Sequence, residues 1–340
     1  MERRIAVIGA GSWGTTVAML ASRARPTSLW ARDASLVQTM HAQRANPRYI
    51  SDCHFPDAMS VTSHIEEATR EASIIFLGVP SHGARAVLEQ LAPFVSPGVG
   101  IVSLAKGLEQ GSLLRITEVI EDCVPHAVPA VLTGPNIAHE IAVGQPAGSV
   151  VACGDEATSK RVQAVFEGSN LRVYTSLDVA GCEIAGVTKN VLAIASGIVD
   201  GLNLGDNARA MLLTRGLAEM SRLGLAAGGN SQTFGGLAGV GDLMVTSMSA
   251  RSRNRRVGME LGAGRDLSGI VAETPMIAEG VQSAAPLVSL AGRLGVELPI
   301  AERVLDIIEG TLSPERAVRQ LMDRPVRGEW DALGDLGLSN

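Results

Sequence analysis

The segment formed by residues 5–14 constrains the fold of this chain more than any other part of the sequence. Apolar residues indicate a buried strand, and Gly9, Gly11 and Gly14 follow in the spacing GxGxxG where a helical pattern begins. The first glycine allows a tight turn, the second lets the backbone approach an anion, and the third lets the helix pack against the strand. Free amide groups and the helix dipole favour a pyrophosphate there. We therefore expect a strand–turn–helix unit that binds a dinucleotide, with a ligand-free glycine turn as the alternative.

The remainder of the first half alternates short apolar runs with helical patterns. The apolar runs occupy residues 4–8, 28–30, 73–79, 100–104, 130–132 and 149–152. Continuous apolar strands separated by helices are typical of a parallel sheet that is covered on both faces. The predicted fold class is α/β, with a doubly wound, Rossmann-like domain over residues 1–182.

Helical periodicity dominates the second half of the chain. One helical face carries Ile184, Val187, Val191, Ala195 and Ile198. Further helical patterns cover residues 208–223, 276–293, 300–309 and 314–322, whereas 324–340 are weakly patterned. We expect an all-α second domain over residues 183–340. Hydrophobic residues make up 46% of the 340 residues, which is enough to build two cores.

The charge balance and the cysteines argue against several classes of protein. The formal net charge is −6, which argues against a nucleic-acid partner or an acidic membrane surface. The 4 cysteines form no CxxC pair and the 6 histidines show no metal-ligand spacing, so we expect reduced thiols and no metal. No signal peptide and no apolar run of bilayer length is found. We expect a cytoplasmic protein without a stable membrane anchor.

Two side chains after the second strand bear on which dinucleotide would bind. Asp33 stands near the position where an acidic residue holds the adenine ribose hydroxyls of NAD, but Arg32 beside it suits the 2′-phosphate of NADP. The pair predicts use of both cofactors, or tolerance of NADP; a solvated Arg–Asp turn is the alternative. Within the glycine loop, Ser12 offers a hydroxyl donor, and Trp13 either covers the cofactor or packs against a neighbouring loop.

Candidate chemical groups follow two later strands. Lys106, just beyond the run 100–104, can reach a phosphate or a carbonyl oxygen, although a surface lysine is the commoner outcome. The next strand ends in Gly134-Pro135-Asn136. This turn leads into a helix, and Asn136 suits its N-cap, where backbone amides could meet a substrate; capping alone is the alternative.

A lysine and an aspartate in the helical half are candidates for acid–base chemistry. Lys189 lies off the apolar stripe of its helix, on a face of small residues. A lysine beside a ketone can donate a proton as hydride reaches the carbon, and burial lowers its pKa towards the working range. An ordinary solvated lysine is the alternative. Asp242 ends a glycine-dense run, where it could orient such an ammonium group, bind substrate hydroxyls or cap the next helix.

A short basic run stands out in this acidic chain. It contains Arg251, Arg253, Arg255 and Arg256. The fork of a guanidinium suits bidentate binding of a phosphate, whereas a solvated basic face is the alternative. The run is short and lacks interleaved aromatic residues, so nucleic-acid binding is not expected.

Ten segments together resemble the bacterial NAD(P)-dependent glycerol-3-phosphate dehydrogenase family, from Val7 to about Ala285. They are VIGAGSWGT (7–15), LWARD (29–33), VPSH (79–82), KGLE (106–109), GPNIAHEIA (134–142), EIAGVTKNVLAIASGIVDGL (183–202), LLTRGLAEMSRLG (212–224), TFGGLAGVGDLMVT (233–246), SRNRRVG (252–258) and AEGVQSA (278–284). Each segment alone is a weak or moderate signal, but their order and spacing are specific.

The resemblance implies reduction of dihydroxyacetone phosphate to sn-glycerol 3-phosphate with NADH or NADPH, which supplies the glycerophospholipid backbone, and a homodimer. It implies that Lys189 is the proton donor and acceptor. The implied substrate positions are Lys106, Gly134, Asn136, Lys189, Asp242, Ser252, Arg253 and Asn254. The implied cofactor positions are Ser12, Trp13, Arg32, Lys106, Ala138, Arg253, Ile277 and Glu279, which join Gly9, Gly11, Gly14 and Asp33 of the motif.

The chain departs from the usual pattern of this family at a few positions. Asn136 and Ile137 stand where the family usually carries serine and phenylalanine, and Ala105 replaces a small hydroxyl residue. Asparagine keeps a donor and an acceptor, so contact with a substrate remains possible. The alternatives are another two-domain dehydrogenase, acting on a β-hydroxy acid or ketopantoate, and a catalytically silent NAD(P)-binding protein. The run 252–256 favours a phosphorylated substrate.

Overall fold

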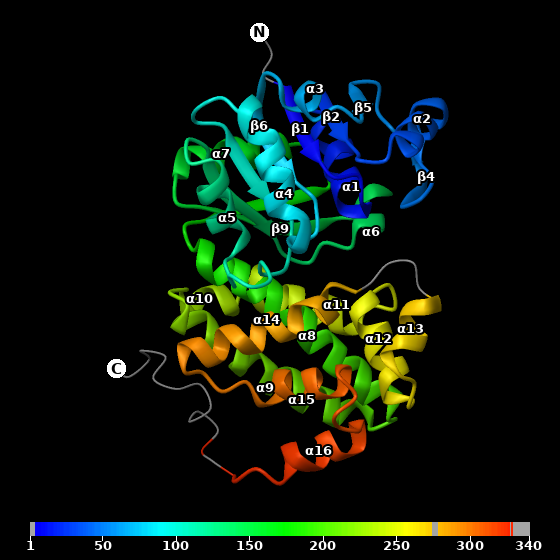
Figure 1. The fold of residues 1–340 in the computed structure, drawn as a ribbon, viewed down its shortest axis with the longest axis vertical. Helices are drawn as coiled ribbons and strands as arrows, with labels where there is room; N and C mark the ends of the chain where they lie inside the picture. Colours follow the sequence, from blue (N-terminus) through cyan, green and yellow to red (C-terminus); the bar gives the residue numbers. More distant parts are fainter. Residues whose placement is uncertain (1–3, 274–277, 327, 329–340) are drawn as a thin grey trace. The chain divides into compact units, whose positions relative to one another are not determined.

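The computed structural model describes residues 4–273, 278–326 and 328, and the chain divides into two compact units (Figure 1). The first unit comprises Met1–Ala105 with Leu114–Val179, and the second comprises Lys106–Leu113 with Ala180–Asn340. Strands and helices alternate in the first unit, and the second is helical. This arrangement confirms the predicted fold class.

An eight-stranded sheet is the frame of the first unit (Figure 1). Its strands lie in the order β10-β9-β8-β7-β6-β1-β2-β5. Their bounds are β1 (Arg4–Ile8), β2 (Thr27–Trp30), β5 (Met59–Thr62), β6 (Ala72–Leu77), β7 (Gly100–Ser103), β8 (Val128–Thr133), β9 (Ala147–Cys153) and β10 (Leu171–Ser176). The chain passes from β1 to β2 and later returns to β6 on the other side of β1. The strand order therefore reverses at β1, and ligands of such sheets bind at this kind of reversal.

Helices cover both faces of this sheet, because alternate side chains of a strand point to opposite faces. Ile5 and Val7 join the core beneath one set of helices, and Ala6 and Ile8 join the core beneath the other set. The first set is α1 (Ser12–Ala21), α2 (Ala34–Gln43) and α7 (Glu156–Val165). The second set is α3 (Ile65–Thr69), α4 (Ser81–Leu91) and α5 (Ile116–Cys123). Two short helices, η1 (Ala92–Phe94) and α6 (Ala138–Ala142), complete the unit.

The direction of one strand and the number of strands differ from the sequence prediction. β9 runs antiparallel to β8, because the connection between them holds only the five-residue helix α6 and turns back instead of crossing over. The sequence also misses the edge strands β5 and β10 and a separate hairpin of β3 (Ala45–Asn46) with β4 (Ile50–His54). Edge strands such as β10 are partly exposed and lack the continuous apolar run that marks a central strand.

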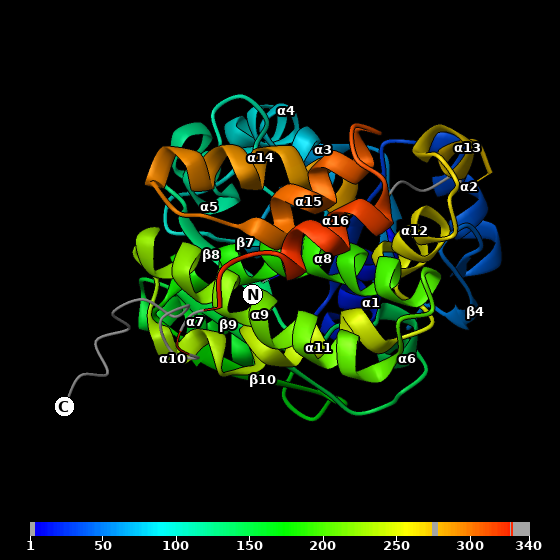
Figure 2. The ribbon, with the colours of Figure 1, turned by 90° about the horizontal axis from the view of Figure 1, so that it is seen from below.

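The second unit is built around α8 (Val179–Gly201), which is buried over nearly its whole length (Figures 1 and 2). The predicted apolar stripe of this helix lies in the core of the unit. The other elements are α9 (Gly205–Ala226), α10 (Ser231–Phe234), the π-helical turn η2 (Leu237–Gly241), α11 (Asp242–Met248), α12 (Arg253–Gly262), α13 (Leu267–Glu273), α14 (Glu279–Leu294), α15 (Pro299–Ile308) and α16 (Pro314–Met322). In Figure 2, α15 and α16 lie side by side in orange and red.

Glycines on α8 and α12 let the two helix backbones touch. A Cβ atom added at Gly197 would overlap the carbonyl oxygen of Arg255, and one added at Gly258 would overlap that of Ile194. One turn further on, a Cβ atom at Gly262 would lie 2.6 Å from the carbonyl oxygen of Ile198. Two facing stripes of small residues therefore bring α12 directly against α8.

By length and composition alone, α8 is apolar enough to cross a bilayer. Its most apolar window is nevertheless 100% buried within the described structure. This helix therefore forms part of the core of the second unit.

Candidate active site

The glycine loop joins β1 to α1 in the first unit. Gly9 has a φ of +114°, and a Cβ atom there would lie 2.6 Å from the carbonyl oxygen of Gly78. A Cβ atom at Gly14 would overlap the carbonyl oxygen of Gly9. At Gly11, by contrast, a Cβ atom would meet nothing within 4 Å. The first and third glycines are thus required by the fold, whereas the space beside the second is open at the start of a helix, as a pyrophosphate would require.

The two variable positions of the loop differ in their surroundings. Ser12 is the first residue of α1, and its carbonyl oxygen accepts a hydrogen bond of 2.9 Å from the Thr16 hydroxyl. Trp13 packs against the core of the first unit, so its ring is in part an ordinary packing group. Its indole Nε1 is buried and has no hydrogen-bond partner in the described part of the chain. A buried donor without a partner is a candidate for contact with a ligand.

The Arg32–Asp33 pair follows β2, the strand beside β1. Asp33 caps α2, and its Oδ1 accepts hydrogen bonds from the backbone amides of Ser35 and Leu36. Its Oδ2 pairs with Arg48 at 3.2 Å. The hydrogen bond from the Ser35 hydroxyl is the main cause that lowers the pKa of Asp33. Arg32 is exposed. The Asp33 carboxylate therefore caps α2 and pairs with Arg48. The sequence alone does not reveal these contacts.

The end of β8 holds a second group of predicted residues in the first unit. Gly134 has a φ of +130°, and a Cβ atom there would lie 3.1 Å from the Cα of Ser149. Asn136 does not cap α6, since the N-cap position belongs to Ile137. Instead, Asn136 Oδ1 accepts a hydrogen bond of 2.5 Å from the Ser149 hydroxyl, and its Nδ2 is buried without a partner among the described residues. Ala138 begins α6, and its carbonyl oxygen accepts a hydrogen bond from Thr16 of α1.

Three charged side chains meet inside the second unit. Lys189 lies on α8, Asp242 begins α11, and Lys106 comes from the segment 106–113. Asp242 is 1% exposed; its Oδ2 lies 2.5 Å from Lys106 Nζ and its Oδ1 lies 3.2 Å from Lys189 Nζ. Lys189 also donates a 2.8 Å hydrogen bond to Thr246, whose hydroxyl in turn donates to Asp242 Oδ1. The sequence predicts each charged member, and the structure brings all of them together.

Burial and the neighbouring charges determine the pKa values of Lys189 and Asp242. It lowers the pKa of Lys189 from 10.5 to about 8, because desolvation and the nearby Lys106 outweigh the attraction of Asp242. For Asp242, burial alone would raise the pKa, but the two ammonium groups outweigh it and hold the pKa below its usual value. Lys189 is therefore not the solvated lysine of the alternative interpretation. It is a buried ammonium group that can give up a proton near neutral pH.

An asparagine that the sequence analysis does not single out links this cluster to α12 and α14. Asn190 donates a 3.0 Å hydrogen bond to the carbonyl oxygen of Lys106 and lies 3.5 Å from Glu279 Oε2. Its own Oδ1 accepts a 2.8 Å hydrogen bond from Asn254, which accepts one from the amide of Gly280. The sequence held a signal for this asparagine, because Asn190 directly follows the candidate Lys189. It held a similar signal for Thr246, which is the last residue of the family motif at residues 233–246.

The basic run at the start of α12 divides into side chains with different surroundings. Ser252 caps the helix by accepting a hydrogen bond from the amide of Arg255. Arg255 forms an ion pair of 2.7 Å with the buried Asp200, so it serves the structure. Arg253 is exposed and forms no hydrogen bond or ion pair with any residue that the structure describes. Of the predicted cofactor positions, Ile277 lies outside the described residues.

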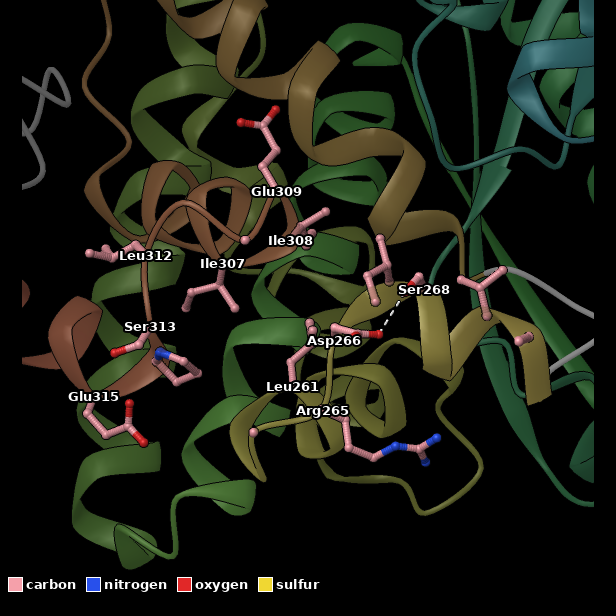
Figure 3. Close-up of a pocket in the computed structure, with 16 residues that line it drawn as sticks. Leu261, Arg265, Asp266, Ser268, Ile307, Ile308, Glu309, Leu312, Ser313 and Glu315 are labelled. Atoms are coloured by element: carbon pink, nitrogen blue, oxygen red, sulfur yellow. Dashed lines mark hydrogen bonds between the residues drawn. The ribbon is translucent and has the colours of Figure 1, made fainter.

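A hollow of about 910 Å³ in the second unit lies apart from the charged cluster (Figure 3). Leu261, Leu267 and Ile307 contribute to its largely apolar lining. The labelled Asp266 accepts a 2.9 Å hydrogen bond from Ser268, drawn as a dashed line in Figure 3. Arg265 at its rim is already paired with Glu260. None of the predicted site residues lines this hollow.

The chain matches two models of one protein family. Residues 4–159 match the model of the NAD-dependent glycerol-3-phosphate dehydrogenase N-terminus, and residues 178–319 match that of its C-terminus. The chain is 46% identical over 329 residues to glycerol-3-phosphate dehydrogenase (NAD(P)+) 2 of Sphingopyxis alaskensis, which covers 97% of this chain and 99% of that protein. It is 45% identical over 333 residues to glycerol-3-phosphate dehydrogenase (NAD(P)+) of Geobacter sulfurreducens, and this match covers 97% of this chain and 99% of that protein.

A solved structure agrees with these matches. The crystal structure of a glycerol-3-phosphate dehydrogenase from Coxiella burnetii superposes with a TM-score of 0.91 at 35% identity. The superposition covers 95% of this chain and 99% of the other. The resemblance drawn from sequence motifs is confirmed, and the chain belongs to the NAD-dependent glycerol-3-phosphate dehydrogenase family.

Proposed function

We propose that this protein reduces dihydroxyacetone phosphate to sn-glycerol 3-phosphate with NADH or NADPH, and catalyses the reverse reaction. Membership of the family supports the substrate and the cofactor. The single observation in this chain that carries the proposal is Lys189, an ammonium group that is 6% exposed, pairs with Asp242 and has a pKa lowered to about 8. Such a group suits the transfer of a proton to a ketone oxygen.

The glycine loop of the first unit supports the cofactor assignment. The open space at Gly11 is what a pyrophosphate would require, and Trp13, two residues further on, has a buried Nε1 donor without a partner among the described residues. Bound nicotinamide supplies the hydride for the reaction. The residues that would hold the cofactor are Gly9, Gly11, Ser12, Trp13, Gly14, Arg32 and Ala138 of the first unit, with Lys106, Arg253 and Glu279 of the second.

Lys189 would hold the proton that the carbonyl oxygen receives. Reduction of a ketone needs a hydride at carbon and a proton at oxygen, so the ammonium gives its proton as the oxygen gains charge. Asp242 favours the charged form of Lys189, and the Thr246 hydroxyl fixes the direction of Nζ. In the reverse reaction the neutral amine accepts the proton of the alcohol.

The substrate phosphate and hydroxyls would be held by polar groups that the protein leaves available. Arg253 has no partner among the described residues, and a guanidinium binds phosphate with two parallel hydrogen bonds. The unpartnered Nδ2 of Asn136 is a second donor. The remaining proposed substrate positions are Lys106, Gly134, Asp242, Ser252 and Asn254.

The wider setting of the enzyme is part of the same proposal. We assign the dinucleotide to residues 1–182 and the substrate chemistry to 183–340, together with Lys106 from the segment that packs in the second unit. We further propose a homodimer in the cytoplasm that supplies the glycerophospholipid backbone. Light scattering of the purified chain measures its mass in solution, and a monomer at working concentrations would contradict the dimer.

An oxidation assay tests the proposed reaction. We expect the purified protein to oxidise NADPH or NADH with dihydroxyacetone phosphate and to be far slower with unphosphorylated dihydroxyacetone. Lys189→Ala should abolish turnover, whereas Lys160→Ala, at a 65% exposed lysine of α7, should not. Faster turnover of ketopantoate or a β-keto acid would overturn the substrate, and cofactor binding without any turnover would indicate a silent binding protein.

A second variant tests the phosphate anchor separately. Arg253→Ala should mainly raise the concentration of dihydroxyacetone phosphate that is needed for half-maximal rate, because one charged contact to the phosphate is lost. Arg251→Ala, at an exposed arginine of the same run, is the matched control. An unchanged substrate requirement in Arg253→Ala counts against this role.

A further inference from the structure

The last turn of α8 carries a buried carboxylate that the proposed reaction does not use. Asp200 is the residue before the last one of α8, and its side chain is only 6% exposed. A negative charge is unfavourable at the carboxyl end of a helix, and it is unfavourable again in the protein interior unless it is paired. An aspartate at this place is therefore stable only with cationic partners.

Two guanidinium groups from two other helices share this carboxylate. Arg255 in the first turn of α12 donates a 2.7 Å hydrogen bond from Nε to Asp200 Oδ2. Arg209 of α9 donates to Asp200 Oδ1 from Nε at 2.9 Å, and also from Nη2. Both carboxylate oxygens are thus bound, and the carboxyl end of α8 is tied to α9 and to the start of α12.

The contact between α8 and α12 shows why the start of α12 needs such a tie. The two helices meet through glycines, and a Cβ atom at Gly197 would overlap the carbonyl oxygen of Arg255. Packed helices usually keep their register because the side chains of one fit between those of the other. Where backbone meets backbone, fewer side chains interlock, so polar contacts have to hold α12 against sliding and rotating along α8.

Two polar contacts hold the first turn of α12 from two points along α8. Asn254 donates a 2.8 Å hydrogen bond to Asn190, and the next residue, Arg255, reaches Asp200. Asn190 and Asp200 are ten residues apart, which is about 15 Å along a helix. Contacts that converge on neighbouring residues from two directions fix the place of that turn. Arg253, the proposed phosphate anchor, directly precedes them.

We propose that Asp200 is a positioning residue for the substrate phosphate, which acts through Arg255 to hold Arg253 in place. In this role Asp200 needs no contact with the substrate. Arg255 is the link, because its main chain contacts α8 at Gly197 and its side chain ends on Asp200. A guanidinium that is already in position binds phosphate more tightly, since ordering a loose turn costs affinity. The inference rests on the proposed function, in which Arg253 anchors a phosphorylated ketone.

Steady-state kinetics of the whole protein with two ketones test this role. Asp200→Asn removes the charge and keeps the volume, so it should raise the KM for dihydroxyacetone phosphate at least about tenfold and leave kcat within about threefold. The same variant should keep kcat/KM for unphosphorylated dihydroxyacetone within about twofold, because that ketone offers Arg253 no phosphate. Arg255→Gln leaves Asp200 paired with Arg209 and should give the same pattern, so it serves as the test if Asp200→Asn does not fold.

A double variant shows whether Asp200 acts through the anchor. In Arg253→Ala the anchor is absent, so the addition of Asp200→Asn should raise the KM for dihydroxyacetone phosphate by less than about a further twofold. Two substitutions that act independently would instead multiply their effects on KM. Multiplied effects would mean that Asp200 does not work through Arg253, and they would overturn the proposal.

A matched variant in the last turns of α12 and the unmodified protein complete the experiment. Glu260→Gln removes an ion pair with Arg265 from the same helix and should leave the kinetics with both ketones unchanged. An unchanged KM in Asp200→Asn, or equal losses with the two ketones, overturns the positioning role alone. If the unmodified protein does not reduce dihydroxyacetone phosphate, the proposed function fails, and this inference fails with it.

Discussion

The glycine loop of the first unit and the charged cluster of the second are built in opposite ways. The loop is one short segment between β1 and α1; its shape depends on absent side chains at Gly9 and Gly14, and the space beside it depends on the absent side chain at Gly11. The cluster depends on side chains, and Lys106, Asp242 and Lys189 come from separate segments. The loop leaves space beside it, whereas Lys189 and Asp242 are enclosed by protein.

This difference teaches which part of an active site tolerates change. A backbone-built anion site depends on φ values and on space, so it is sensitive to any added atom. A side-chain cluster depends on charge balance in a place of low dielectric, so it is sensitive to the loss of one partner even when the volume is unchanged. Small substitutions in the two regions should therefore change different measured quantities: turnover for the charged cluster, and nucleotide affinity for the glycine loop.

The largest effect is expected when the charge balance of the cluster is broken. Asp242→Asn keeps the volume but leaves Lys106 and Lys189 without their shared counter-charge, and removing one partner of a buried pair costs about 3–5 kcal/mol. The pKa of Lys189 should fall further, and turnover of dihydroxyacetone phosphate should drop at least about a hundredfold. Asp206→Asn, at a 94% exposed aspartate of α9, is the control. Unchanged turnover would mean that the cluster is not the acid.

The converse substitution adds one atom to the loop. Gly11→Ala meets no protein atom within 4 Å, so the melting temperature should stay level while the affinity for AMP and NADPH falls about tenfold or more. Gly292→Ala is the matched control, because it also meets nothing within 4 Å but lies in α14 of the second unit. If Gly11→Ala binds nucleotide as tightly as the original protein, the open space is not the pyrophosphate site.

A pH profile separates the two regions in the unmodified protein. Because the pKa of Lys189 is lowered to about 8, kcat/KM for reduction should fall roughly tenfold per unit of pH above that value, as the donor loses its proton. Oxidation of glycerol 3-phosphate should rise through the same range, since it needs the neutral amine. The affinity for AMP, which we assign to the first unit, should stay level. A reduction rate that is constant up to about pH 10 would contradict the assignment, since an ordinary lysine titrates near there.

The smallest effect concerns a buried carboxyl that takes no part in the proposed reaction. Glu219 is 3% exposed, and burial raises its pKa from 4.5 to about 7 although the amides of Ile300 and Ala301 bond it. The folded state thus binds more protons than the unfolded state between these values. Stability from this group is full below about pH 4.5 and is lost as pH rises through 7.

Thermal unfolding of Glu219→Gln tests this expectation. The variant should lose less stability than the original protein between about pH 5 and 8, by at most about 3 kcal/mol. Glu309→Gln, at an exposed glutamate, should follow the original protein. Parallel curves for all three proteins would show that Glu219 does not titrate in this range.

The fold was predictable wherever burial leaves a continuous pattern. The six strands read from apolar runs are all present, because central strands are covered on both faces. The edge strands β5 and β10 were not predictable in this way, since polar residues alternate with apolar ones in β5 and most of β10 is exposed, so neither has a continuous apolar run. The direction of β9 depends on how a short connection turns, and no residue pattern records that choice.

The residues of the candidate site could be predicted one by one from the sequence. The contacts between them could not. Lys189 and Asp242 could be named from the chemistry of their types, but their contact across two helices is a property of the packed unit. Asn136 illustrates the limit, because the sequence suits a helix cap at this position, whereas the structure gives the cap to Ile137 and Ser149 donates to the Asn136 oxygen. Arg48 had no signal of its own, since only the hairpin brings it to Asp33.

The direct contact between α8 and α12 has a consequence for how this enzyme can accumulate mutations. The spacing of the two helices is set where main-chain atoms meet at Gly197, Gly201, Gly258 and Gly262, so no side chain separates the helices at these four positions. Exchanges among the surrounding leucines, isoleucines and valines can therefore alter the core without altering the distance from Lys189 to the start of α12. The reacting end of the unit is in this way insulated from substitutions in its interior, although alanine is already too large at each of these four glycines.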